Sequence, residues 1–173
     1  LDIMSDNLAQ YLINLNVKEN EKIAIFLDKS IEMIVSILAV LKSHSAYLPI
    51  DISYPLERID YILNDANVNK IITSSNLSIS TFNNCLQVFI DKLDLHTVTN
   101  FDYKPRSMDA TCYVMYTSGS TGKPKGVIIE QKSILRLVIN PNYIKFEKEE
   151  RILQTGSMVF DACTFEIWAA LLH

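Results

Sequence analysis

Small, hydroxyl-bearing and cationic residues are concentrated in one stretch of the chain, from Tyr116 to Gly126. Three of the four glycines in the 173-residue sequence lie within it. Glycine permits backbone conformations with positive φ and lets a ligand approach the main chain closely, at an entropic cost that an ordinary loop has no cause to bear. Backbone N–H groups, hydroxyls and ammonium groups can all point at the same anionic oxygens. The stretch therefore predicts a loop that binds a polyphosphate such as ATP.

Two alternative interpretations of this stretch carry less weight. The P-loop of kinases and GTPases requires the pattern G-x-x-x-x-G-K-[ST]. Here Gly119 lies three residues before Gly122, and Lys123 is followed by Pro124 instead of a serine or threonine that could bind magnesium. A plain polar turn between two strands remains an alternative, but it does not need eleven residues of such uniform chemistry.

Composition and charge exclude several classes of function. The sequence is 49% apolar, which is enough to build a core, and its net charge is −4. No cluster of Lys and Arg lies outside the loop, so we expect no nucleic-acid partner. The longest largely apolar run, Ile31 to Leu41, contains Glu32 and is too short to span a bilayer, so no membrane partner is expected. The three cysteines and three histidines share no metal-ligand spacing, which predicts no metal site and reduced thiols in a cytoplasmic protein.

Strands alternate with helices along the chain, and this predicts an α/β fold with a largely parallel sheet flanked by helices. Ser30 is expected to cap one helix, and Pro55 to sit in the first turn of another. The expected helices are 5–15, 31–42, 55–65, 131–139 and 162–172. The expected strands are 22–27, 46–50, 70–73, 86–90, 110–116, 126–129 and 152–155, with a surface link over residues 91–109.

Several stretches are similar to one known family. Residues 116–127, YTSGSTGKPKGV, resemble the phosphate-loop motif of the adenylate-forming (AMP-binding) enzymes. Residues 41–59, LKSHSAYLPIDISYPLERI, resemble the second core motif of the adenylation domains of non-ribosomal peptide synthetases, and residues 160–168, FDACTFEIW, resemble the fourth. Residues 1–12 resemble the end of the first. The order and spacing of these motifs cover nearly the whole chain and are more specific than any one motif.

This resemblance implies an amino-acid-activating enzyme that works in two half-reactions. The substrate carboxylate attacks the α-phosphate of ATP, pyrophosphate leaves, and the aminoacyl group then passes to the phosphopantetheine thiol of a peptidyl carrier protein beside neighbouring synthetase domains. Positioning and charge stabilisation supply the rate of the first step. By their place in the motif, the residues that would wrap the β- and γ-phosphates are Thr117, Ser118, Gly119, Ser120, Thr121, Gly122 and Lys123, with Lys125 assisting.

The resemblance also assigns an amino-acid site to the fourth motif. Asp161 would bind the α-ammonium group of the substrate, which is a charge-assisted contact. The alternative is that Asp161 is the N-cap of the following helix, where aspartate is common. Ala162 and Phe165 would line the pocket for the substrate side chain and suggest an apolar amino acid, whereas Trp168 is typical of a helix core.

Tyr54 and Arg58 match the second motif, and we interpret their role as structural. This chain departs from the motif at residues 43–45, where the family has glycines that end a helix in a left-handed turn. A non-glycine residue there would cost up to about 1 kcal/mol. The departure affects stability more than chemistry.

The resemblance ends before the motifs that supply the adenine and Mg²⁺ contacts and the catalytic lysine of the family. Residues 1–173 are therefore expected to form an incomplete N-terminal large subdomain, without the C-terminal part and the small lid domain, and no catalytic residue is assigned within them. We expect this piece alone to be inactive. Two other hypotheses remain: a freestanding acid–CoA or amino acid–carrier protein ligase, and a non-catalytic nucleotide-binding remnant.

Overall fold

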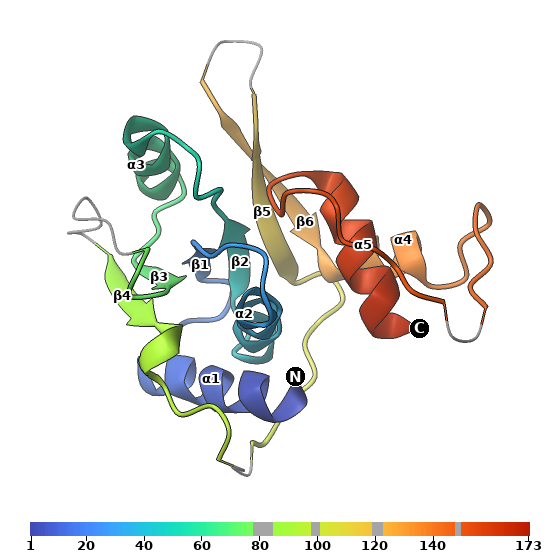
Figure 1. The fold of residues 1–173 in the computed structure, drawn as a ribbon, viewed down its shortest axis with the longest axis horizontal. Coiled ribbons are helices and arrows are strands. Elements are labelled where there is room, and N and C mark those ends of the chain that lie inside the picture. Colours follow the sequence, from blue (N-terminus) through green and yellow to red (C-terminus); the bar gives the residue numbers. More distant parts are fainter. Residues whose placement is uncertain (78–84, 98–100, 119–122, 148–149) are drawn as a thin grey trace.

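A six-stranded β-sheet forms the centre of the described part of the chain, for which we use a computed structural model (Figure 1). The structure describes residues 1–77, 85–97, 101–118, 123–147 and 150–173. The strands are β1 (Lys22–Ile25), β2 (Ala46–Pro49), β3 (Lys70–Thr73), β4 (Leu86–Phe89), β5 (Thr111–Thr117) and β6 (Lys125–Glu130). The helices are α1 (Asp2–Asn14), α2 (Ile31–Lys42), α3 (Leu56–Asp65), α4 (Gln131–Val138) and α5 (Asp161–Leu172), with a short 3₁₀ helix η1 (Ile90–Lys92).

The sheet has the order β4-β3-β1-β2-β5-β6. All neighbouring strands run parallel except β5 and β6, which form an antiparallel hairpin. The predicted α/β fold with a largely parallel sheet is thus confirmed. Because β5 runs parallel to β2, its carboxyl end lies at the same edge of the sheet as the carboxyl ends of β1 and β2. Ligands of open parallel sheets bind outside this edge, and the hairpin projects from it (Figure 1).

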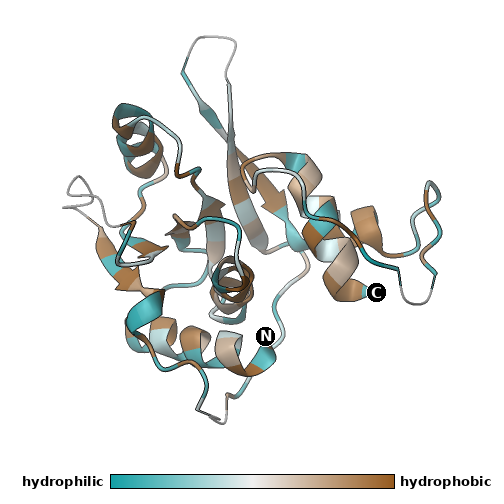
Figure 2. Cartoon of the chain, in the orientation of Figure 1, coloured by the Kyte–Doolittle hydropathy of each residue, from teal (hydrophilic) through white to brown (hydrophobic). Residues whose placement is uncertain are grey.

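Alternate residues of the central strands pack on opposite faces of the sheet, as the two-residue period of a strand requires. Ile23 and Ile25 belong to a core shared with α1, α2, α4 and α5, whereas Ala24 belongs to a second core under α3. The strands and the inner faces of the helices are accordingly apolar (Figure 2). Burial on both faces explains why these strands are continuous apolar runs in the sequence.

Helix α2 begins and ends as its sequence predicts. The Ser30 side chain accepts a hydrogen bond from the backbone N–H of Met33, which confirms the predicted N-cap. After α2 ends at Lys42, His44 takes a left-handed conformation with φ of 63°. The left-handed turn that the motif's glycines would favour after α2 is therefore present in this chain, with His44 in the left-handed position.

Three further features bear on the predictions. The predicted strand Ile152–Thr155 is wrong: these residues have no strand assignment, and Leu153 is 78% exposed. The three cysteines are free, and burial raises the pKa of the Cys112 thiol to about 12, which makes it unreactive. Within the described residues, none of the helices is both long enough and apolar enough to cross a membrane.

Candidate functional site

The stretch predicted to bind phosphate lies at the end of the β5–β6 hairpin. Thr117, the last residue of β5, pairs with Lys125, the first residue of β6. Both are exposed, as are Ser118 and Lys123. The structure therefore brings four of the eight predicted phosphate-binding residues together at the open end of one hairpin. The other four, Gly119, Ser120, Thr121 and Gly122, lie outside the described residues.

Gly126 allows close packing within the hairpin stem. It lies opposite Tyr116 in the antiparallel pair. A Cβ atom at this position would lie 3.0 Å from Cγ1 of Val114 and 3.2 Å from the ring of Tyr116. The φ angle of Gly126 is outside the left-handed region. This glycine is thus required by the space above the Tyr116 ring, and not by backbone conformation.

Helix α3 supports the same hairpin through two tyrosines. The Tyr116 hydroxyl donates a hydrogen bond of 2.6 Å to Oδ2 of Asp65, at the end of α3. Tyr61, within α3, donates a longer bond of 3.3 Å to the carbonyl of Pro124. Burial and the adjacent Asp65 carboxylate raise the pKa of Tyr116, so its phenol remains a donor. Both contacts fix the stem of the predicted phosphate loop against α3.

A cavity of about 630 Å³ connects the hairpin to the start of α5. Such a volume is ample for a small-molecule ligand. Its walls are mostly apolar or aromatic, with hydroxyls, one guanidinium and one carboxylate among them. The lining residues are Tyr54, Arg58, Tyr113, Met115, Tyr116, Thr117, Ser118, Val127, Ile129, Val159, Phe160 and Asp161.

Asp161 reaches this cavity from the first turn of α5. Its side chain is exposed, and it lines the same space as Thr117 and Ser118. The N-cap of α5 is Phe160, and no side-chain capping bond is made. The alternative interpretation of Asp161 as the N-cap therefore does not hold. As a first-turn residue its negative charge still interacts favourably with the helix dipole.

Ala162 and Phe165 lie apart from the cavity lining. Ala162 is exposed. The Phe165 ring packs against the rings of Phe146, with centroids 6.1 Å apart, and Tyr143, at 6.2 Å. Their assignment to a substrate side-chain pocket stays a prediction. Trp168 is 7% exposed, which agrees with its expected place in the core.

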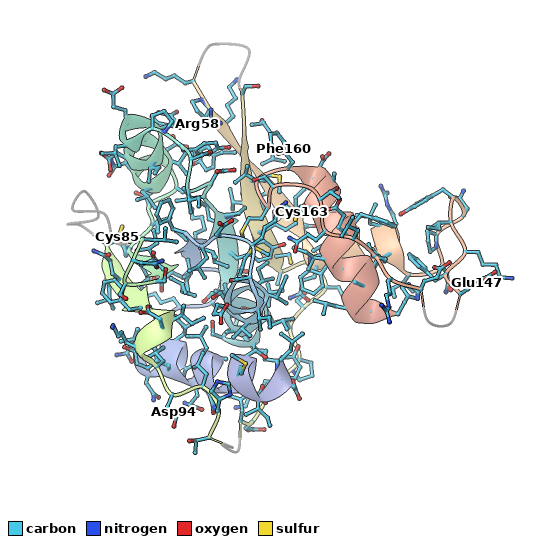
Figure 3. The ribbon with its side chains drawn as sticks, in the orientation of Figure 1. Arg58, Cys85, Asp94, Glu147, Phe160 and Cys163 are labelled. Atoms are coloured by element: carbon cyan, nitrogen blue, oxygen red, sulfur yellow. The ribbon has the colours of Figure 1, made fainter. Side chains whose placement is uncertain are left out.

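Tyr54 and Arg58 form part of the cavity wall. The guanidinium carbon of Arg58 lies 4.1 Å from the centre of the Tyr54 ring, in a cation–π contact. Nε of Arg58 is buried and has no hydrogen-bond partner among the described residues. Figure 3 labels Arg58 on α3 and Phe160 at the start of α5. The sequence analysis interpreted the role of Tyr54 and Arg58 as structural. It did not predict that both residues line the cavity that contains Asp161.

The residues that hold the start of α5 were missed by the sequence analysis. Glu166 accepts hydrogen bonds from Thr155 and Gly156, and Lys29 donates one to the Thr155 carbonyl. The presence of Gly156 ten residues before Glu166 was the available signal. Lys29 gave none, because its partner lies far along the chain.

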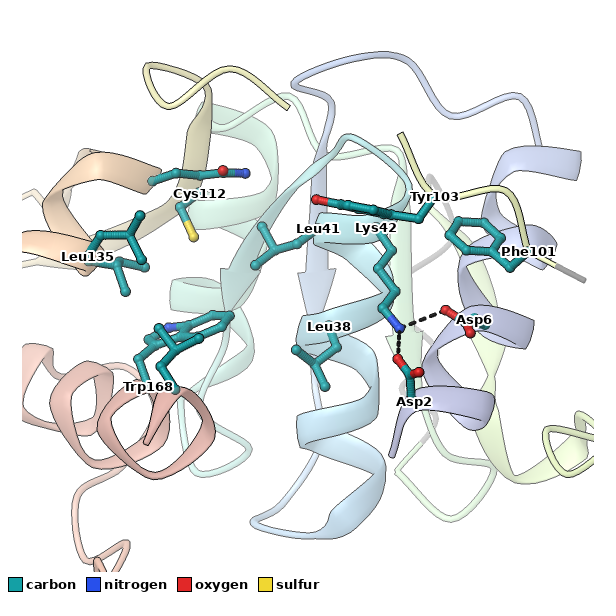
Figure 4. A pocket seen from close by; sticks show the side chains of 13 residues that line it. Asp2, Asp6, Leu38, Leu41, Lys42, Phe101, Tyr103, Cys112, Leu135 and Trp168 are labelled. Atoms are coloured by element: carbon teal, nitrogen blue, oxygen red, sulfur yellow. Dashed lines mark hydrogen bonds and ion pairs between the residues drawn. The ribbon is translucent and has the colours of Figure 1, made fainter. Parts of the chain in front are cut away.

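A second cavity, of about 570 Å³, lies between α2 and α5 and contains none of the predicted site residues (Figure 4). It is largely apolar, and at one end Lys42 forms ion pairs with Asp2 and Asp6 at 2.5 and 2.6 Å. Among the described residues, no group of three or more His, Cys, Asp or Glu side chains is placed to hold a metal ion.

Comparisons with known proteins show relatives in sequence and in fold. Gramicidin S synthase 2 from Brevibacillus brevis is 37% identical over 174 residues, which cover 100% of this chain and 4% of that protein. The solved N-terminal subdomain of NpsA from Klebsiella oxytoca, in complex with 3-hydroxyanthranilyl-AMSN, superposes with a TM-score of 0.83 at 26% identity, over 98% of this chain and 42% of that one. PA1221, described as an NRPS protein containing adenylation and PCP domains, gives a TM-score of 0.84 at 26% identity, over 98% and 34%.

The chain thus spans a small fraction of the synthase and less than half of the solved subdomain. Residues 1–173 match the family described as AMP-binding enzyme over their whole length. The chain belongs to the AMP-binding enzyme family.

Proposed function

We propose that this chain is part of an adenylation domain that activates an amino acid with ATP in non-ribosomal peptide synthesis. The observation that carries the proposal is the 630 Å³ cavity, because it places Thr117 and Ser118 of the phosphate-loop stem in the same space as Asp161. The amino acid and ATP must lie in adjoining parts of one site, because the carboxylate of the amino acid attacks the α-phosphate of ATP.

Each side of the cavity has a distinct task in the first half-reaction. Hydroxyls of Thr117 and Ser118 and the ammonium groups of Lys123 and Lys125 would hold the β- and γ-phosphates of ATP. Asp161 would bind the α-ammonium of the amino acid. A carboxylate oxygen of the substrate then attacks the α-phosphorus, the bond from that phosphorus to the bridging oxygen breaks, and pyrophosphate leaves with the bond electrons. The products are aminoacyl-AMP and pyrophosphate.

The second half-reaction transfers the aminoacyl group to a carrier protein. The phosphopantetheine thiolate attacks the acyl carbon and AMP leaves, so that a thioester replaces the mixed anhydride. The adenylation and PCP domains named for PA1221 support a peptidyl carrier protein as the partner. Mg²⁺, when bound with ATP, would neutralise phosphate charge, and we assign its ligands to the part of the protein outside these residues.

Amino-acid-dependent ATP–pyrophosphate exchange tests the proposal. The full-length protein that contains this chain would be assayed across a panel of amino acids, together with its Asp161→Ala and Lys125→Ala variants and the exposed Asp102→Ala as control. We expect exchange with an apolar amino acid. Asp161→Ala should reduce it about 100-fold or more, because loss of one charge-assisted contact costs about 3 kcal/mol or less and misplaces the substrate as well.

The control variant should keep its exchange activity. Exchange with none of the amino acids, but ligation of simple carboxylates to CoA, would instead identify an acid–CoA ligase. Nucleotide binding without exchange of any kind would identify a non-catalytic remnant. Isolated residues 1–173, assayed beside the full-length protein, are expected to show no exchange.

A further inference from the structure

One carboxylate, that of Glu166, accepts three hydrogen bonds from the segment that leads into α5. We call residues 154–160 the approach segment. Glu166, on α5, accepts hydrogen bonds from the backbone N–H groups of Thr155 at 3.1 Å and Gly156 at 3.0 Å, and from the Thr155 hydroxyl at 2.7 Å. Gly156 permits this approach, because a Cβ atom there would lie 3.3 Å from Oε2 of Glu166. The Thr155 N–H, the Thr155 hydroxyl and the Gly156 N–H thus all donate to the Glu166 carboxylate.

Two charged residues tie the same segment to the sheet. Lys29, in the connection after β1, donates a hydrogen bond of 2.6 Å to the Thr155 carbonyl. Asp51, after β2, accepts one of 2.7 Å from the Ser157 hydroxyl. Both residues lie at the carboxyl edge of the parallel sheet, since they follow β1 and β2 in the chain. The approach segment, although it forms no strand, is therefore fastened to two central strands by side chains.

The backbone between these contacts carries Asp161. Residues 157–160 form a turn, closed by a 3.0 Å bond from the Phe160 N–H to the Ser157 carbonyl, and Met158 and Val159 within it are buried. The hydrogen bonds from Thr155 and Gly156 to Glu166 join the two ends of residues 155–166. Asp161 lies within the loop that these bonds close. Because α5 begins at Asp161, directly after its N-cap Phe160, the place of Asp161 at the cavity is set by the backbone that leads into the helix.

We propose that Glu166 is a positioning residue that sets the place of the Asp161 carboxylate in the cavity through its bonds to Thr155 and Gly156. The inference rests on the proposed function, since it assigns Glu166 to the amino-acid side of that same site. Glu166 itself lies outside the cavity lining, so it acts on the substrate only through Asp161. Its removal should therefore weaken amino-acid binding and leave the phosphate loop unaffected.

Three variants of the full-length protein distinguish this positioning role from a role in stability alone. Glu166→Ala removes every bond of the group. Glu166→Gln can keep them, because the amide oxygen accepts from both backbone N–H groups while the amide NH₂ donates to the Thr155 hydroxyl. Thr155→Val removes one hydroxyl donor and keeps the backbone. Glu19→Ala, an exposed glutamate elsewhere, is the matched control.

The measurement is the KM for the amino acid and the KM for ATP in ATP–pyrophosphate exchange, with melting temperatures alongside. A displacement of about 1 Å at a reacting group can cost about 100-fold. We expect Glu166→Ala to raise the amino-acid KM about tenfold or more and Thr155→Val about threefold, with the KM for ATP within about twofold. Glu166→Gln should restore the amino-acid KM to within about twofold of the unaltered protein, and Glu19→Ala should not change it.

Each other outcome counts against the inference. An unchanged amino-acid KM in Glu166→Ala overturns it while the proposed function stands. So does an equal rise of both KM values, or loss of folding in Glu166→Ala with a normal KM in Thr155→Val, since either result assigns Glu166 to stability alone. Absence of exchange by the unaltered protein with every amino acid overturns both proposals.

Discussion

The β5–β6 hairpin and the approach segment line one cavity, yet they are fixed in different ways. The hairpin carries its predicted phosphate-binding residues at and just beyond the ends of its strands. Helix α3 supports its stem by the Tyr116–Asp65 and Tyr61–Pro124 bonds. The first four residues of β6 are exposed. The approach segment has no strand pairing, but the side chains of Glu166, Lys29 and Asp51 hold it.

This difference follows from what each side would bind. A polyphosphate presents many equivalent oxygens, so backbone N–H groups, hydroxyls and flexible ammonium groups can share it in several arrangements. A single ammonium group must meet one carboxylate in one place. The amino-acid side therefore needs a fixed backbone, whereas the phosphate side needs a firm stem and small residues.

The largest effect should come from the same substitution made in both regions. Gly126→Ala places a Cβ atom 3.0 Å from Val114 and 3.2 Å from Tyr116, whereas at Gly156 the nearest contact is the end of the Glu166 side chain, at 3.3 Å. Overpacking costs about 1–3 kcal/mol, and a shift of a flexible side chain costs less. We expect Gly126→Ala to lower the free energy of unfolding by about 1–2 kcal/mol, and Gly156→Ala by less.

Urea unfolding of the two variants, compared with the unaltered chain, measures this difference. If Gly156→Ala were the more destabilising of the two, the approach segment would be the more tightly packed region and the hairpin stem the more tolerant one. Equal effects would mean that the two regions do not differ in packing at their glycines.

A smaller effect is expected at the bond between the hairpin and α3. Tyr116→Phe removes the hydroxyl that donates to Asp65 at 2.6 Å, and Tyr61→Phe removes the 3.3 Å bond to the Pro124 carbonyl. Asp65 is exposed and can bond to water instead, so we expect about 1 kcal/mol for Tyr116→Phe and less for Tyr61→Phe. Thermal unfolding would measure both, and a larger loss for Tyr61→Phe would show that Tyr61 is the main support.

The smallest effect should be a dependence on pH that involves the approach segment. Hydrogen bonds from the Thr155 hydroxyl and then the Gly156 N–H hold the pKa of Glu166 below its ordinary value of 4.5. Burial raises the pKa of Asp51, but hydrogen bonds from Ser53 and Ser157 outweigh it and the net pKa is below 3.8. A lowered pKa in the folded state contributes stability above the ordinary value, and this stability is lost as the pH falls through the folded-state pKa.

The test is the urea midpoint at pH 6 and at successive values below 4.5. We expect the midpoint of the unaltered chain to fall more steeply than that of Glu166→Gln, which has no carboxylate to protonate at that position. The exposed Glu19→Gln controls for loss of one negative charge. If the urea midpoints of the unaltered chain and of Glu166→Gln fell in parallel with pH, the ionised Glu166 carboxylate would not contribute to the stability of the approach segment.

Local sequence patterns predict much of this fold because its central strands are buried on both faces. The cap at Ser30, the helix after Pro55 and the apolar strands are each specified by a few neighbouring residues. The error at Ile152–Thr155 has a physical cause. Its apolar residues suggest a strand, but the segment is held by Glu166 and Lys29, and the contact with Lys29 links distant parts of the sequence.

The candidate site was predictable only in part. Composition predicted a phosphate loop in residues 116–126, and the family resemblance predicted Asp161 as a substrate ligand; both assignments stay predictions. Composition could not show that Gly126 makes room for the Tyr116 ring, since that depends on the register of β5 against β6. Nor could it show that Arg58 lies in the same cavity wall as Asp161, which only the packing of α3 beside the hairpin determines.

The strand order also has a consequence for how the chain folds. β5 joins the sheet beside β2, with Tyr113 next to Tyr47, although β3 and β4 come between them in the sequence. The first four strands all precede residue 111 in the chain, so they can pair with one another before β5 is added. Closing the long loop that brings β5 to β2 costs chain entropy and slows folding. The edge of β2 that pairs with β5 therefore stays open until this loop closes, and the β5–β6 hairpin joins the sheet last.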